Sequence, residues 1–221
     1  MHRQGRQDEQ GKGARVNSIP SIDKADRYVS HLSRLAQNDP GRRSALRRGL
    51  GRPVDDPMVR KAHAVVVPWL PTRPGRAVES AYYSVAALIA AQPVGRRGGT
   101  PETEALDPPA TPEGEEKSKR PTTSIGGTLG LAVRDNKLNP VTVEARLHLV
   151  CRQDVTGLHR QLPGLVRQLA AKELTPDWGR LLVDLSWWER GRDRVAKGWL
   201  QDFYRAMNNT TEDNGSESEN Q

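Results

Sequence analysis

Apolar residues recur at helical spacing along most of the chain, and this pattern predicts an all-α protein. In the first half, the segments 25–36 and 78–89 carry apolar residues at intervals of three and four positions, as on one face of an α-helix. Two shorter helices are expected between them, over 40–49 and over 57–69, because each begins at an Asp-Pro pair and ends near a turn residue. No stretch alternates apolar and polar residues as a half-buried strand does.

The second half carries four apolar stripes, each typical of one helix with a buried face. The stripes are Val143, Leu147, Val150 and Cys151; Leu158, Leu162, Leu165, Val166 and Leu169; Trp178, Leu181, Leu182 and Leu185; and Val195, Trp199 and Phe203. Asn139 before a proline and Thr175 before Pro176 are expected helix starts. We therefore expect several helices here.

Composition divides the chain into two small helical bundles and three connecting or terminal segments. Residues 95–121 include four glycines and five prolines, which predicts a flexible linker or long loop between bundles at 17–94 and 122–207. Residues 1–16, a basic tail, and 208–221, an acidic tail, lack apolar periodicity, so we expect both to be disordered. No apolar run approaches a membrane span, and a cytoplasmic location is expected.

Positive charge is concentrated in the two predicted bundles, and most of it is arginine. Of 34 lysines and arginines only eight are lysines, and the net charge is +7. Formal charges give +8 for residues 17–97 and +4 for 121–207, against −3 for 98–120 and −4 for 208–221. Because a guanidinium binds phosphate through two parallel hydrogen bonds, this composition favours a nucleic-acid partner. A GC-rich coding sequence would produce the same arginine excess, and this alternative stays open.

Eight arginines are candidate contacts to nucleic acid. Four crowd the short helix near residues 40–49, where they repel one another unless an anion screens them, and Arg160 and Arg167 share a face opposite the leucine stripe, within about 20° of each other. Arg152 projects away from its stripe, and Arg146 flanks it. The candidates are Arg42, Arg43, Arg47, Arg48, Arg146, Arg152, Arg160 and Arg167. For any one of them a merely solvated helix face is the simpler interpretation.

Catalytic chemistry is not indicated. The single cysteine, Cys151, lies on an apolar stripe and is interpreted as a buried thiol, and no internal disulfide is possible. Gly126, Gly127 and Gly130 resemble a phosphate loop only weakly, because no Gly-Lys-Ser or Gly-Lys-Thr follows them. The paired tryptophans near 187 are expected to fill the core more than to stack on bases. No catalytic residue, cofactor or metal site is predicted.

Taken in order, the elements resemble the CasB family, the small subunit of type I-E CRISPR Cascade complexes. The resemblance rests on four pieces spread over residues 21–207. They are Leu46-Arg47-Arg48 after the short capped helix, Ser124-Ile125-Gly126, Arg146-Leu147 leading to Arg152-Gln153-Asp154, and the run from Asp177-Trp178 through Trp187-Trp188 to Phe203.

This resemblance implies a non-catalytic, all-helical protein of two bundles, present as two copies beside the other Cascade subunits. Its basic surface would hold guide RNA, target DNA and the displaced DNA strand without reading sequence, in antiviral defence. By the resemblance Arg47, Arg48 and Arg152 are the first candidates for phosphate contact and Arg146 the next. The alternatives are a stand-alone helical DNA-binding regulator, which would discriminate between sequences, and a helical enzyme acting on nucleic acid.

Overall fold

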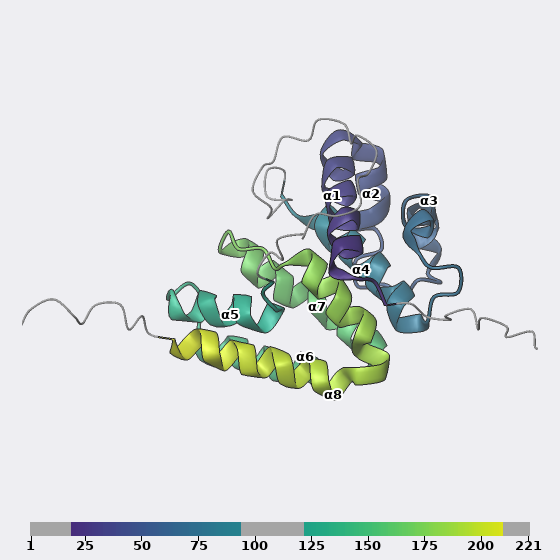
Figure 1. Ribbon diagram of the computed structural model, residues 1–221. Coiled ribbons are helices and arrows are strands. Elements are labelled where there is room, and N and C mark those ends of the chain that lie inside the picture. Colours follow the sequence, from purple (N-terminus) through teal and green to yellow (C-terminus); the bar gives the residue numbers. More distant parts are fainter. Residues whose placement is uncertain (1–18, 94–121, 210–221) are drawn as a thin grey trace, which may run out of the picture.

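The part of the chain that the structure describes is entirely helical. The computed structural model describes residues 19–93 and 122–209, and these form eight α-helices and two short 3-10 helices, with no strand (Figure 1). The all-α prediction is therefore confirmed. The predicted linker 95–121, the predicted tail 1–16 and all but two residues of the predicted tail 208–221 lie outside the described residues. No described helix is long and apolar enough to cross a membrane.

The helices of the first half begin where the capping signals predict. Ser21 accepts a hydrogen bond from the backbone N–H of Lys24, and Asp39 accepts one from that of Arg42 at 2.8 Å, so α1 and α2 both start at a side-chain cap. The elements are α1 (Ile22–Asn38), α2 (Pro40–Arg47), a 3-10 helix (Pro57–Ala62), α3 (His63–Val66), a second 3-10 helix (Val67–Trp69) and α4 (Arg76–Ala91).

The second half differs from the prediction in two places. Its helices are α5 (Ile125–Arg134), α6 (Pro140–Cys151), α7 (Val155–Ala171) and α8 (Trp178–Asn208). The apolar pattern did not predict α5. The third and fourth stripes lie on one long helix, α8, which bends at Gly191, where the backbone leaves the helical region (φ −147°, ψ 33°). Asp177, two residues after the predicted start, caps α8.

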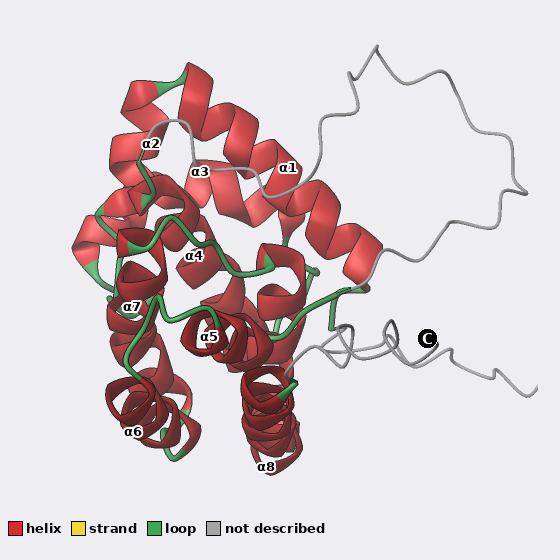
Figure 2. Ribbon diagram, turned by 90° about the vertical axis from the view of Figure 1, so that its left-hand side faces the viewer, coloured by secondary structure: helices red, strands yellow, loops and turns green. Residues whose placement is uncertain are grey.

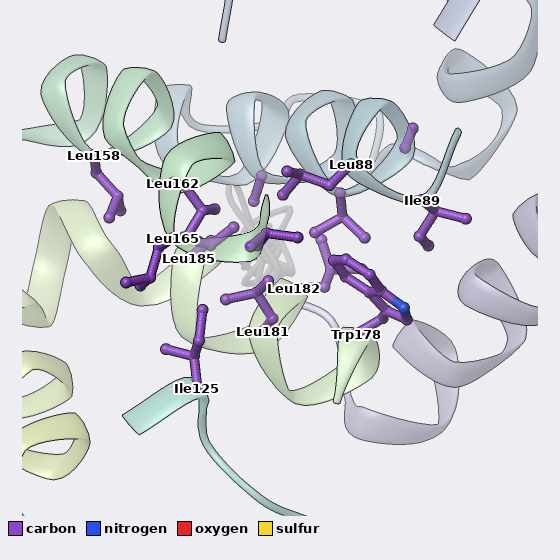
Figure 3. Close-up of a cluster of buried hydrophobic side chains, with 14 of the residues drawn as sticks. Leu88, Ile89, Ile125, Leu158, Leu162, Leu165, Trp178, Leu181, Leu182 and Leu185 are labelled. Atoms are coloured by element: carbon purple, nitrogen blue, oxygen red, sulfur yellow. The ribbon is translucent and has the colours of Figure 1, made fainter. Parts of the chain in front are cut away.

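The bend in α8 lets one helix serve both halves of the core. Its first part lies against α1 and α4, and its second part runs beside α5 and α6; Figure 2 looks along these last three helices. Figure 3 shows Leu88 and Ile89 of α4 facing leucines of α7 and the first turns of α8. Within the described residues the buried apolar side chains form one continuous cluster.

Helix α5 packs on α8 through glycines. A Cβ atom added to Gly126 would lie 2.6 Å from the carbonyl carbon of Trp199, and one added to Gly130 would lie 2.9 Å from the Cβ of Ala206. Two helix backbones approach this closely only where side chains are absent. Gly126 and Gly130, whose resemblance to a phosphate loop is weak in the sequence, are therefore helix-packing residues.

Candidate nucleic-acid interface

The four arginines of α2 have different surroundings. Arg42 is exposed and pairs with Asp39, with 3.3 Å between Nε and Oδ2. Arg43 is half-buried and donates from Nε to the carbonyl of Ala90 and from Nη2 to that of Gln92, both at 3.2 Å. It therefore satisfies carbonyls at the end of α4 that have no partner inside the helix.

Arg47, the last residue of α2, and Arg48, its C-cap, remain available for a ligand. Both are exposed at the end of the helix. Neither has an ion-pair partner among residues 19–93 and 122–209. Positive side chains are favourable at a helix C-terminus, but that interaction is worth only about 0.3–1 kcal/mol and leaves the guanidinium groups open to solvent.

The loop after α2 lies against α7, the helix that carries the candidates Arg160 and Arg167. Gly51, with a positive φ of 70°, lies beside Pro163 and the carbonyl of Arg160. Pro163 also lines a hollow of about 290 Å³, together with Leu50 and Arg167. Arg160 and Arg167 are exposed, as the leucine stripe on the opposite face of α7 predicts. We call the exposed set Arg42, Arg47, Arg48, Arg160 and Arg167 the α2–α7 surface.

The remaining two candidates lie on α6. Arg146 is exposed on the helix, and Arg152 is the exposed residue that ends it. Arg152 lines a groove of about 500 Å³ between α6 and α8, which we call the α6–α8 groove. Its lining comprises His148, Cys151, Arg152, Asp193, Ala196, Lys197, Leu200, Gln201 and Tyr204. The structure thus places five of the eight arginines on the α2–α7 surface and two on α6, while Arg43 is engaged with carbonyls at the end of α4.

Basic residues near the bend of α8 were missed by the sequence reasoning. Lys197 lines the α6–α8 groove, and Arg194 places its guanidinium carbon 4.8 Å from the ring centroid of Trp187. The signal was available, since three arginines surround Gly191 within five residues. Trp188 is buried against Trp199, as expected for a core residue, whereas Trp187 is half-buried.

The single cysteine lies in the core. Cys151 is buried, its thiol lies 3.9 Å from the carbonyl oxygen of Ala196, and burial raises the pKa of the thiol to about 11. The interpretation as a buried thiol is confirmed, because a thiol with this pKa holds its proton at neutral pH.

Elsewhere, the hydroxyl of Ser84 lies 2.7 Å from Nδ1 of His159, and burial lowers the pKa of this histidine to about 4.

Residues 42–204 match the family model described as CRISPR-associated protein Cse2. The chain belongs to the Cse2 family. A chain from a solved structure described as a CRISPR RNA-guided surveillance complex is 39% identical to it, with a TM-score of 0.69, over 84% of this chain and 94% of that one. The resemblance to CasB seen in the sequence is thereby confirmed.

More distant structures share the fold of this Cse2 chain. A Cse2-family protein from Thermus thermophilus is 22% identical, with a TM-score of 0.55, over 82% of this chain and 98% of its own. CasB of M. ruber is 20% identical, with a TM-score of 0.56, over 85% and 94%. No curated protein sequence matches the chain.

Proposed function

We propose that this Cse2 chain is a non-catalytic subunit of an RNA-guided surveillance complex, Cascade, and that it binds nucleic-acid backbones without reading sequence. It would support the pairing of guide RNA with target DNA and hold the displaced DNA strand, in antiviral defence within the cytoplasm. Its partners would be the other Cascade subunits and a second copy of itself. The 39% identity to a chain of such a complex supports this assignment.

One observation carries the nucleic-acid part of the proposal: exposed arginines without carboxylate partners recur on separate helices. Among the described residues, Arg47, Arg48, Arg160 and Arg167 of the α2–α7 surface have no ion-pair partner, nor does Arg152 at the α6–α8 groove. A folded protein usually gains little from such charges. A phosphate backbone would neutralise them and release its own counterions, which makes binding favourable and salt-dependent.

The physical role follows from the energetics of strand exchange. Replacing a DNA duplex with an RNA–DNA hybrid is nearly balanced in free energy, so modest contacts from a protein to the strands shift the equilibrium. Sequence specificity comes from guide pairing, and the protein needs no base contacts. Arginines that bind only phosphate fit this requirement.

The test is a triple substitution, Arg47→Ala/Arg48→Ala/Arg152→Ala, assayed by fluorescence anisotropy with single- and double-stranded DNA across a salt series. Loss of three phosphate contacts should lower the slope of log K against log salt by about 2 to 3 on duplex DNA. The loss of affinity should be the same for DNA molecules of unrelated sequence. Circular dichroism verifies that the helices are intact.

A matched control removes the same charge elsewhere on the described surface, at the exposed residues Arg27, Arg34 and Arg134. The control variant should keep most of the parent's affinity. If both triple variants weaken binding equally, net charge alone explains the effect and the site assignment is wrong. Discrimination between unrelated duplexes by the parent protein would favour the stand-alone regulator instead.

A further inference from the structure

The α6–α8 groove combines an apolar floor with cations that lack partners. Ala196 and Leu200 of α8 line it together with the buried Cys151. Arg152 and Lys197 line it from opposite helices, and neither has an ion-pair partner among the described residues. Such a groove is suited to an extended, acidic segment, which can neutralise both cations while covering the floor.

The acidic groups near these two cations are already engaged. Asp193 lines the groove but accepts a hydrogen bond from Nε of Arg192 at 3.2 Å. Glu144, beside His148, accepts one from the hydroxyl of Tyr204 at 2.6 Å. The groove therefore does not neutralise Arg152 and Lys197 from within.

We propose that residues 210–221 of the same chain dock in the α6–α8 groove. This segment carries four carboxylates and no cationic side chain, which gives it a charge of −4. It follows α8 directly, and Lys197 lies 11 residues before the end of that helix at Asn208, a distance of about 16 Å at 1.5 Å per residue.

The length of the segment permits this return. Glu217 and Glu219 follow Asn208 by nine and eleven residues, and a fully extended chain spans at most about 3.3–3.6 Å per residue. The reach of about 30 Å therefore exceeds the distance back to Lys197. Glu212 and Asp213 remain closer to the end of α8.

Docking would make the segment a competitor of nucleic acid, because Arg152 is a proposed contact of both the segment and the nucleic acid. This consequence rests on the proposed function. Apparent affinity falls by the fraction of molecules in which the groove is free, so a groove that is free in about one molecule in five weakens nucleic-acid binding about fivefold. The phosphate backbone, with more charges than the segment, would displace it.

Docking itself is tested without nucleic acid. A carbodiimide couples a lysine amine to a nearby carboxylate, and mass spectrometry of the digested full chain identifies the pair. We expect Lys197 to couple to Glu217 or Glu219, and the exposed Lys61 and Lys172 to couple to neither. The product should disappear at about 0.5 M salt, where charges are screened within a few ångströms. Equal coupling to all three lysines, or none to Lys197, would overturn the proposal.

Competition is tested with a neutralised segment in which all four acids are replaced: Glu212→Gln, Asp213→Asn, Glu217→Gln and Glu219→Gln. The variant should bind single-stranded DNA about fivefold more tightly than the parent at low salt. A matched control neutralises four acids of the segment 98–120 (Glu102, Glu104, Glu113 and Glu115, each to Gln), so both variants have the same net charge.

The outcomes separate the two proposals. Equal affinity of the two neutralised variants would contradict competition by residues 210–221. If the parent and both variants bind no nucleic acid, the proposed function fails, while the coupling of Lys197 still decides whether the segment docks.

Discussion

Replacing Gly126 with alanine should disrupt the contact between α5 and α8. The added Cβ would lie 2.6 Å from the carbonyl carbon and 2.9 Å from the Cα of Trp199. Real Cβ atoms do not approach backbone atoms to such distances, and a helix backbone cannot move aside as a flexible side chain can. The two helices would have to separate by about an ångström or tilt.

The cost of this separation follows from what the interface buries. Ile125 and Leu129 of α5 and Phe203 of α8 are almost fully buried, and moving the helices apart weakens the packing of all three. Overpacking a core usually costs about 1–3 kcal/mol, and rigid backbone on one side puts this site at the upper end. We expect Gly126→Ala to lower the free energy of unfolding by about 3 kcal/mol.

Gly198 supplies a control on the other helix, one residue before Trp199. A Cβ there meets no atom within 4 Å, so Gly198→Ala should stabilise α8 by about 0.4–1 kcal/mol through helix propensity and reduced freedom of the unfolded chain. Thermal unfolding followed by circular dichroism should show the melting temperature about 6–12 °C lower for Gly126→Ala and a few degrees higher for the control. Equal melting temperatures for the parent and Gly126→Ala would refute the close-packing argument.

Two buried polar groups support further predictions. Burial lowers the pKa of His159 from 6.5 to about 4, so the unfolded chain binds a proton first as the pH falls. The free energy of unfolding therefore decreases between these two pH values, by up to about 3 kcal/mol. Urea unfolding at pH 7 and at pH 4.5 should show a smaller change in the free energy of unfolding for His159→Gln than for the parent. Asp184, buried in α8, accepts hydrogen bonds from Nε of Arg180 at 2.9 Å and, across the bend, from Nε1 of Trp199 at 2.7 Å. Trp199→Phe should lower the free energy of unfolding by about 1–3 kcal/mol for the lost bond, whereas Asp184→Asn, which keeps an acceptor, should cost less in the same assay.

Helices with strong local signals were predictable from the sequence. The caps at Ser21, Asp39 and Asn139 and the leucine stripe of α7 depend on neighbouring residues only, so the pattern contains the information. Helix α5 was not predictable in this way. Three of its ten residues are glycines, each about 1 kcal/mol less favourable than alanine in a helix, and what stabilises it is contact with a segment some 70 residues away.

The long helix α8 shows a related limit. Its two apolar stripes are separated by a charged stretch around Gly191, residues 189–194, so the pattern predicts two helices where the structure has one bent helix. A hydrogen bond spans the bend, from Nε1 of Trp199 on one side to Asp184 on the other. Local periodicity carries no record of such a contact.

The candidate site was predictable as a set of residues but not as a surface. Arg43 and Arg47 look alike in the sequence, yet Arg43 donates both of its bonds to carbonyls at the end of α4, while Arg47 is exposed. Whether an arginine is open to a phosphate thus depends on which backbone groups the fold brings within its reach. Lys197 is the opposite case. A single lysine in a helix of mixed charge does not stand out in the sequence, but in the structure it lines the same groove as Arg152 at the end of α6. Charge counts therefore predict only a class of partner, whereas the unpaired cations of the folded chain predict where that partner would bind.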